Sequence, residues 1–234
     1  MELRLVSKAS TETHAITPKQ LVIASWTGRD RAAMEGRLAE LEAMGIPRPP
    51  SLPMFYRNAA QRLTTASKID VIGDQTSGEA EFVMLKFGGR LWVGVGSDHT
   101  DRALEAQNAS LSKQVCDKPV SNEWWAFDDL LSHWDSLRLR SYIVSFDGSK
   151  VLYQEGSVNS MLSPQSLLAL WESTGVADDG AALFCGTLPA IGGVRGALRF
   201  EIELEDPALG RTLRHAYDIE VLPQHLNSTS SIPS

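Results

Sequence analysis

Cysteine is scarce in this sequence: there are two in 234 residues, Cys116 and Cys185. Neither surrounding segment, KQVCDK or ALFCGT, contains a second cysteine or a histidine at the spacing of a metal site. A zinc centre and a thiol-based active site are therefore not favoured. A disulfide is not expected either, because proteins of a reducing compartment rarely keep one.

Long apolar runs and an excess of positive charge are also lacking. No apolar run approaches the roughly 18 residues that a membrane-spanning helix needs. The opening residues MELRLVSKAS lack the basic segment and apolar core of a secretory signal, so we expect a cytoplasmic protein with no membrane partner. The net charge of -7 argues against nucleic acid as a partner, because nucleic-acid binding needs a basic surface.

The sequence does contain a series of short β-type segments. KIDVIG, GEAEFVMLKF, RLWVGVGS and several later segments are rich in strand-forming residues and are separated by turn residues. Helical patterns are few and do not alternate regularly with strands, which predicts an α+β, mostly β fold. We expect a small N-terminal α/β annex at 1–45, a catalytic domain at 46–224 and a disordered tail at 225–234.

Turn and cap residues locate the individual elements. Asp30 as an N-cap and Gly45 as a stop signal predict a helix over 31–44. In the first 25 residues, the apolar stretches ELRLV and KQLVIASW predict a small hairpin-like piece. Further predicted elements are hairpins at Gly88-Gly89 and Asp147-Gly148, short helical pieces in DRALEAQNASLSKQ and DDLLSHWDSL, and a helix capped by Ser163 with Pro164 in its first turn.

Two like charges stand at the start of one strand. Glu79 and Glu81, in GEAEF, fall on the same face, where their repulsion is costly unless water or a cation relieves it. A turn at Gly88-Gly89 returns the chain past Glu81 and brings Asp98 near the pair. Three carboxylates without Cys or His favour a hard ion, Mg²⁺ or Mn²⁺, with Ca²⁺ as an alternative. The alternative readings are a solvated strand face for the glutamates and a helix cap for Asp98.

Five motifs, taken in order, resemble those of the fumarylacetoacetate hydrolase superfamily. They are GEAEF, GSDHTDR, LSKQVCDKPVS, the hairpin and helix in DGSKVLYQEGSVNSMLSPQSLLALW, and LFCGTLPAIGG. The resemblance covers about residues 45–222 and is closest to a bacterial branch of unknown function. It implies a mixed β-sandwich roll, usually assembled as a homodimer.

The resemblance also implies roles for particular residues. It assigns Glu79, Glu81 and Asp98 to the metal, Lys113 to a substrate oxygen as a catalytic residue, and Arg102, Arg57, Gly186 and Thr187 to substrate binding. Hydrolytic members carry a His-Glu pair that activates water. In this chain Met34 stands near the histidine position, and Glu35 is the nearest candidate base.

These assignments imply a divalent-metal-dependent hydrolase that cleaves a C–C bond in a small dicarbonyl or 2-oxo acid through a metal-chelated enolate. The substrate is a small carboxylate or carbonyl compound. A decarboxylase or isomerase using the same metal site, and a C–N hydrolase, stay open as alternatives. A metal- or ligand-binding module without catalysis is the alternative outside enzymes.

Three histidines lie near the candidate site or among apolar residues. We expect His99 to be a surface residue and His133, in LLSHWDSL, to be packed in the core. His14 lies in a polar segment, and an alternative hypothesis places it over the site as a general base.

Overall fold

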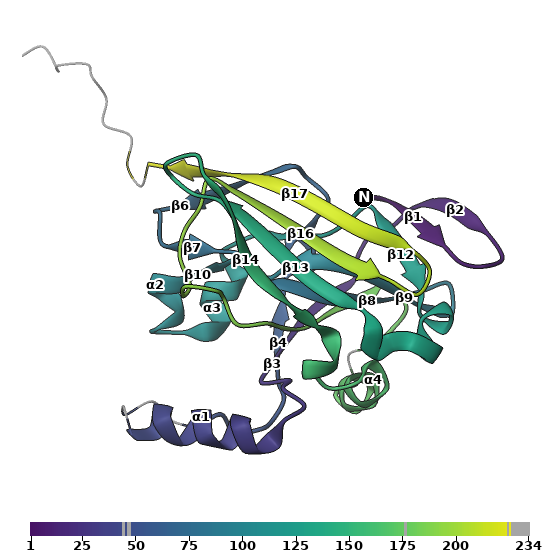
Figure 1. Cartoon of the computed structure of the whole chain (residues 1–234), viewed down its shortest axis with the longest axis horizontal. Helices are drawn as coiled ribbons and strands as arrows, with labels where there is room; N and C mark the ends of the chain where they lie inside the picture. Colours follow the sequence, from purple (N-terminus) through teal and green to yellow (C-terminus); the bar gives the residue numbers. More distant parts are fainter. Residues whose placement is uncertain (44, 46–47, 176, 224, 226–234) are drawn as a thin grey trace, which may run out of the picture.

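The structure is a computed structural model that describes residues 1–234 except 44, 46–47, 176, 224 and 226–234. Most of the strand residues lie in two β-sheets that pack face to face (Figure 1). The eight-stranded sheet has the order β2 (Thr11–Ala15), β1 (Glu2–Val6), β12 (Glu123–Ala126), β9 (Arg90–Ser97), β8 (Ala80–Phe87), β15 (Ala181–Thr187), β3 (Gln20–Ser25) and β4 (Met54–Asn58). The five-stranded sheet has the order β14 (Lys150–Ser157), β13 (Arg138–Val144), β16 (Arg199–Asp206), β17 (Arg211–Leu222) and β6 (Lys68–Ile72).

Short elements connect these sheets. Two small ladders join β5 (Leu63–Thr64) to β11 (Lys118–Pro119) and β7 (Thr76–Ser77) to β10 (Thr100–Asp101). The α-helices are α1 (Arg31–Ala43), α2 (Arg102–Glu105), α3 (Ala109–Gln114) and α4 (Pro164–Glu172). The 3-10 helices are η1 (Ala60–Arg62), η2 (Phe127–Asp129), η3 (Leu131–Ser136) and η4 (Val158–Ser160). The mostly β, α+β architecture is the one that the sequence predicts.

The core lies between the two sheets. On β16, Phe200, Ile202 and Leu204 are buried, and the glutamates between them are partly exposed, as expected for a strand with one face on the core. On β8, residues of both faces are buried, because Phe82 faces the second sheet while Val83 belongs to a smaller cluster on the other side. Strand β8 is therefore a central strand covered on both faces, and this is where the two glutamates are placed.

The N-terminal segment differs from its prediction. The predicted hairpin between ELRLV and KQLVIASW is wrong: β1 pairs with the polar strand β2, while β3 pairs with β15 and β4. Strand β1 also pairs in parallel with β12, more than 100 residues later. Residues of the predicted annex thus contribute strands to the main sheet. The predicted tail lies, apart from His225, outside the described residues.

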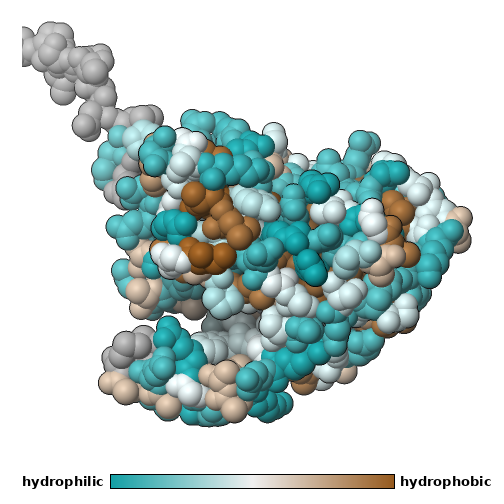
Figure 2. Space-filling view, viewed as in Figure 1, coloured by the Kyte–Doolittle hydropathy of each residue, from teal (hydrophilic) through white to brown (hydrophobic). Residues whose placement is uncertain are grey.

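Helix α1 lies apart from the two sheets (Figure 1). Asp30 caps it as predicted, since its Oδ1 accepts the backbone N–H groups of Ala32 at 2.9 Å and Ala33 at 3.0 Å. Leu38 is buried, but most of the described side chains of α1 are exposed. In the space-filling view, α1 stands away from the main body across a notch (Figure 2).

Both predicted hairpins are present, and the Ser163 hydroxyl caps α4. The segment DDLLSHWDSL forms the 3-10 helices η2 and η3 in place of a regular helix. No described helix is both long enough and apolar enough to cross a membrane.

Candidate metal centre and substrate cleft

Three carboxylates meet at the end of the β8–β9 hairpin. Glu81 lies on β8, Glu79 directly precedes β8, and Asp98 directly follows β9. The register pairs Ala80 with Ser97, and the Asp98 backbone N–H donates to the Glu79 carbonyl at 3.0 Å. One ligand oxygen from each carboxylate lies within 4.8 Å of the others. The hairpin thus produces the convergence that the sequence predicts.

Burial makes this convergence costly. Glu81 is 2% exposed and Asp98 is fully buried. Burial, together with the charges of Asp98 and Glu79, raises the pKa of Glu81 well above its usual value. Burial also raises the pKa of Glu79, against the opposing effects of Arg102 and Lys113. The charged forms of the two glutamates are therefore disfavoured here, and a bound cation would stabilise them.

Asp98 behaves differently because two ammonium groups contact it. Burial favours its neutral form, but Lys113 and Lys118 outweigh that effect and lower the pKa of Asp98. Lys113, on α3, donates to Asp98 Oδ2, and Lys118 Nζ lies 3.3 Å from Oδ1. The charges of Asp98 and Glu79 in turn raise the pKa of Lys113 despite its burial. Lys113 is therefore held as a cation beside the carboxylates.

Lys118 was not singled out from the sequence. Its side chain is fully buried, and Nζ also donates to the carbonyls of His99, Lys113 and Cys116. It therefore ties the segment after β9 to the end of α3. The sequence offers no local signal for this role, because most of the partners of Lys118 are backbone oxygens whose positions depend on the fold.

Arg102 connects the carboxylates to a neighbouring acid. One terminal nitrogen, Nη2, lies 3.1 Å from Glu79 Oε1, and the other, Nη1, donates to Glu105 Oε2 at 2.7 Å. Nε donates to the Ser77 hydroxyl at 2.7 Å. The guanidinium is thus held at the start of α2, where Asp101 forms the cap that the sequence analysis gave as an alternative role of Asp98.

The end of β15 forms the other wall of the site. The Gly186 N–H donates to Glu81 Oε2 at 2.6 Å, and the Thr187 hydroxyl donates to the Ala80 carbonyl at 2.7 Å. Gly186 has φ +101°, and a Cβ there would lie 1.9 Å from the Thr27 hydroxyl, so only glycine fits. The buried Gln154 donates to the Thr187 hydroxyl at 2.8 Å, a link that the sequence analysis did not identify.

His99 is buried, so its predicted surface position is wrong. Nδ1 lies 3.0 Å from the Tyr217 hydroxyl, and Nε2 lies 2.9 Å from the Thr76 hydroxyl. Burial and the charge of Lys118 lower the pKa of His99 to about 3, so the ring is neutral. It joins the segment that carries Asp98 to the second sheet.

Some predicted site residues lie elsewhere. Glu35 is exposed on α1, and its carboxylate pairs with Arg48 at 2.8 Å. Arg57 is exposed on β4, at an edge of the large sheet. His14 lies on the edge strand β2, 3.1 Å from Glu12. Among the described residues, none of these three contacts the carboxylate cluster.

Two adjoining hollows open beside the carboxylates. The inner hollow, about 210 Å³, is lined by Gly78, Glu79, Tyr153, Gln154, Thr187, Leu188, Pro189, Ala190 and Val194. The outer hollow, about 500 Å³, is lined by Asp74, Gln75, Thr76, Arg102, Glu105, Val194, Arg195 and Gly196. The hollows share Val194, and the contact between Glu79 and Arg102 joins their walls. Together they form a cleft large enough for a small molecule.

The donor set suits a hard divalent ion. Three carboxylates without a thiolate or imidazole are the ligands that Mg²⁺, Mn²⁺ and Ca²⁺ prefer. The raised pKa values of the partly buried Glu79 and the buried Glu81 indicate a place where positive charge is stabilising. The residues present therefore fit such an ion.

Comparison with solved structures defines the class of fold. A 2-keto-3-deoxy-D-arabinonate dehydratase complexed with magnesium and 2,5-dioxopentanoate matches with a TM-score of 0.64 at 17% identity, over 89% of this chain and 75% of that one. A yeast fumarylacetoacetate hydrolase family protein matches with a TM-score of 0.62 at 13% identity, over 91% and 97%. Fumarylacetoacetate hydrolase from psychrophilic Exiguobacterium antarcticum matches with a TM-score of 0.60 at 14% identity, over 92% and 82%. The predicted resemblance to this superfamily is confirmed in the fold.

The family itself is defined by sequence. The profile described as "Protein of unknown function (DUF2848)" matches residues 24–217, and the chain belongs to that family. No curated protein matches the chain. The candidate chemistry therefore rests on the residues of the site.

Proposed function

We propose that this protein is a divalent-metal-dependent enzyme that processes a small 2-oxo acid or dicarbonyl compound. The observation that carries the proposal is the convergence of Glu79, Glu81 and Asp98 beside a cleft, with the Lys113 ammonium in contact with Asp98. The fold shared with the magnesium-bound dehydratase supports it. A bound divalent ion would supply Lewis acidity toward two oxygens of the substrate.

The residues around the ion then have distinct tasks. Lys113 is the catalytic residue that holds a substrate oxygen, where its charge stabilises a developing enolate. Arg102 lines the outer hollow and Thr187 the inner one, and each positions a substrate carboxylate or carbonyl. Gly186 keeps Glu81 in place through its N–H.

For the reaction we propose hydrolysis of a C–C bond, in which water adds OH to the carbonyl carbon and the released carbanion takes the proton. That reaction needs a base for the water, and Glu35 is the candidate from the sequence. Because Glu35 pairs with Arg48 on the exposed helix α1, we keep decarboxylation or isomerisation of a 2-oxo acid as a second candidate. Those reactions need enolate stabilisation but no activated water. The alternative of C–N hydrolysis would use the same electrophilic chemistry.

Calorimetry with Mn²⁺ on the wild type and on Glu81→Gln tests the metal site. We expect binding in the wild type, at least about 100-fold weaker binding in the variant, and unchanged binding in the control Glu203→Gln, on the partly exposed side of β16. Absence of binding by the wild type would contradict the proposal. Oxaloacetate and acylpyruvates are then assayed with Mn²⁺ or Mg²⁺. Metal binding without turnover of either would favour a binding module.

The homodimer and the cytoplasmic location expected from the sequence are also proposals. Light scattering tests the first: a mass near that of one chain would contradict it.

A further inference from the structure

Arg195 is a positively charged residue that lines the outer hollow of the cleft. Among the residues that the structure describes, no carboxylate pairs with it, whereas Arg102 in the same hollow contacts both Glu79 and Glu105. Asp74 also lines the outer hollow, but it is exposed, so water screens its charge. The outer hollow therefore contains one guanidinium that no carboxylate pairs with in the described part of the chain.

The Arg195 side chain is held in place by its own loop. One terminal nitrogen, Nη1, donates to the carbonyls of Ile191 and Gly193, both at 2.9 Å. The guanidinium lies 5.0 Å from the centre of the Tyr153 ring, and the Arg195 backbone N–H donates to the Tyr153 hydroxyl at 3.3 Å. Gly192 and Gly193, with φ of 77° and 84°, give the loop the left-handed turn that directs the Gly193 carbonyl back to the side chain.

This arrangement leaves binding capacity unused. A guanidinium has five N–H donors, and the two carbonyl bonds account for two of them. A planar guanidinium with free donors suits a carboxylate, which it can bind through two parallel hydrogen bonds. Since little side-chain freedom remains to be lost on binding, the geometry favours recognition of an anion.

The position of Arg195 relates this anion to the metal centre. Glu79 lines the inner hollow, Arg195 lines the outer hollow, and Val194 lines both. A substrate whose head lies at the carboxylate cluster can therefore extend past Val194 toward the Arg195 guanidinium.

We propose that Arg195 binds a second carboxylate at the far end of the substrate, so that the preferred substrates are 2-oxo diacids. This inference rests on the proposed function, which supplies the metal-bound head. Arg195 thereby sets specificity, and the metal and Lys113 act on the other end of the molecule.

Matched probes test the inference by calorimetry on the Mn²⁺-loaded protein. 2-Oxoglutarate and 2-oxopentanoate differ only in a terminal carboxylate against a methyl group, and 2-oxoadipate and 2-oxohexanoate form the same pair one carbon longer. We expect the wild type to prefer the diacid by about tenfold or more in at least one pair. Arg195→Gln should reduce that preference to within about twofold without weakening the monoacid, and Arg195→Lys should retain part of it.

The exposed Arg138 provides the control, and Arg138→Gln should keep the wild-type preference. Equal binding of diacid and monoacid by the wild type in both pairs would overturn the inference alone. A preference that survives in Arg195→Gln would also overturn it. If Mn²⁺ binds but no 2-oxo acid does, the proposed function fails, and the inference fails with it.

Discussion

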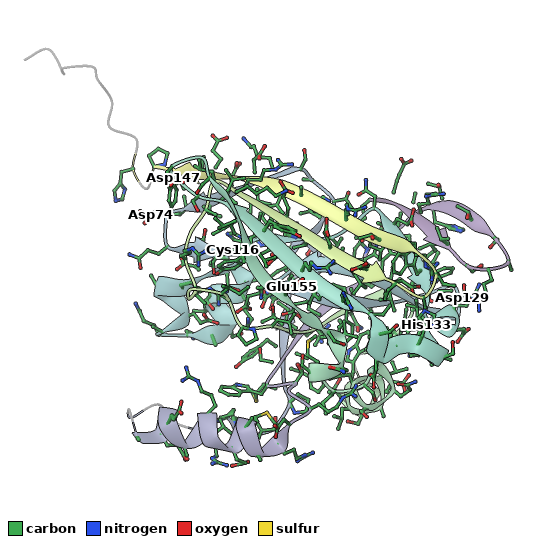
Figure 3. All side chains as sticks on the ribbon, in the orientation of Figure 1. Asp74, Cys116, Asp129, His133, Asp147 and Glu155 are labelled. Carbon is green, nitrogen blue, oxygen red and sulfur yellow. The ribbon has the colours of Figure 1, made fainter. Side chains whose placement is uncertain are left out.

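Two fully buried aspartates, each with two basic partners, stand in different parts of this molecule. Asp98 lies after β9 with Lys113 and Lys118, and Asp206 lies at the end of β16 with His133 and Arg211. In Figure 3, Cys116, close in sequence to Lys113 and Lys118, and His133, of the second cluster, are labelled well apart. Both clusters place a buried carboxylate against two basic side chains.

Their surroundings explain why only one is a candidate site. The Asp206 carboxylate accepts a hydrogen bond from the Leu209 N–H at 3.2 Å and lies 3.0 Å from both His133 Nε2 and Arg211 Nε. This single carboxylate therefore finds its partners in the β16–β17 hairpin and in η3. Asp98 lies beside two further carboxylates, those of Glu79 and Glu81, and burial raises the pKa of both. A buried ion pair alone indicates a structural role, while converging like charges beside a cleft indicate a candidate cation-binding site.

Replacing Asp98 should have the largest effect. Asp98→Asn removes a proposed metal ligand and leaves Lys113 and Lys118 buried without their charge partner. We expect the free energy of unfolding to fall by about 3–5 kcal/mol and Mn²⁺ binding to weaken by about 100-fold or more. Urea unfolding and calorimetry on the folded fraction measure both. Intact Mn²⁺ affinity in this variant would remove Asp98 from the site.

Replacing Asp206 should separate stability from metal binding. Asp206→Asn leaves His133 and Arg211 without their buried carboxylate, which should cost about 3 kcal/mol in unfolding free energy. Mn²⁺ affinity should stay within about twofold of the wild type. A large loss of Mn²⁺ affinity in a folded Asp206→Asn protein would show that the two clusters are not independent.

Replacing Glu81 should stabilise the metal-free protein, whereas replacing Asp98 or Asp206 should destabilise it. Because its pKa is raised well above the usual value, the neutral amide of Glu81→Gln removes a charge that the fold disfavours. We expect the metal-free variant to be more stable than the metal-free wild type by about 1 kcal/mol near neutral pH. Thermal unfolding in the presence of a chelator measures this difference. A variant less stable than the metal-free wild type would argue against unfavourable burial and repulsion of the carboxylate charges.

Replacing Glu35 should have the smallest effect on stability and on metal affinity. Its exposed pair with Arg48 contributes little, so Glu35→Gln should alter the unfolding free energy by less than about 0.5 kcal/mol and leave Mn²⁺ affinity unchanged. If a candidate substrate is turned over, the same variant tests the proposed base. A collapse of hydrolysis with metal binding intact would place Glu35 at the reacting water despite its position on α1.

The convergence of the three carboxylates could be predicted because it depends on local rules. A strand alternates its faces, and a two-residue glycine turn fixes the register of the returning strand, so Glu79, Glu81 and Asp98 had to meet. The same kind of local signal located the hairpin at Asp147-Gly148 and the cap of α4.

The rest of the site depends on contacts between distant segments. Gln154 reaches Thr187 from another sheet, Lys118 binds backbone carbonyls, and Arg195 is fixed by its own loop and by Tyr153. The sequence predicts a surface position for His99, yet Tyr217 of β17 contacts its buried ring. The partners of β1 and β3 likewise lie far along the chain, where no local pattern points to them.

The central claim is that Glu79, Glu81 and Asp98 together hold a divalent ion. Crystals grown with Mn²⁺ and measured at its absorption edge test this directly through the anomalous difference map. The account predicts a manganese peak bound by all three carboxylates, with the Lys113 ammonium beside it. A fully loaded crystal with no peak there, or with the ion held by other residues, would contradict the account.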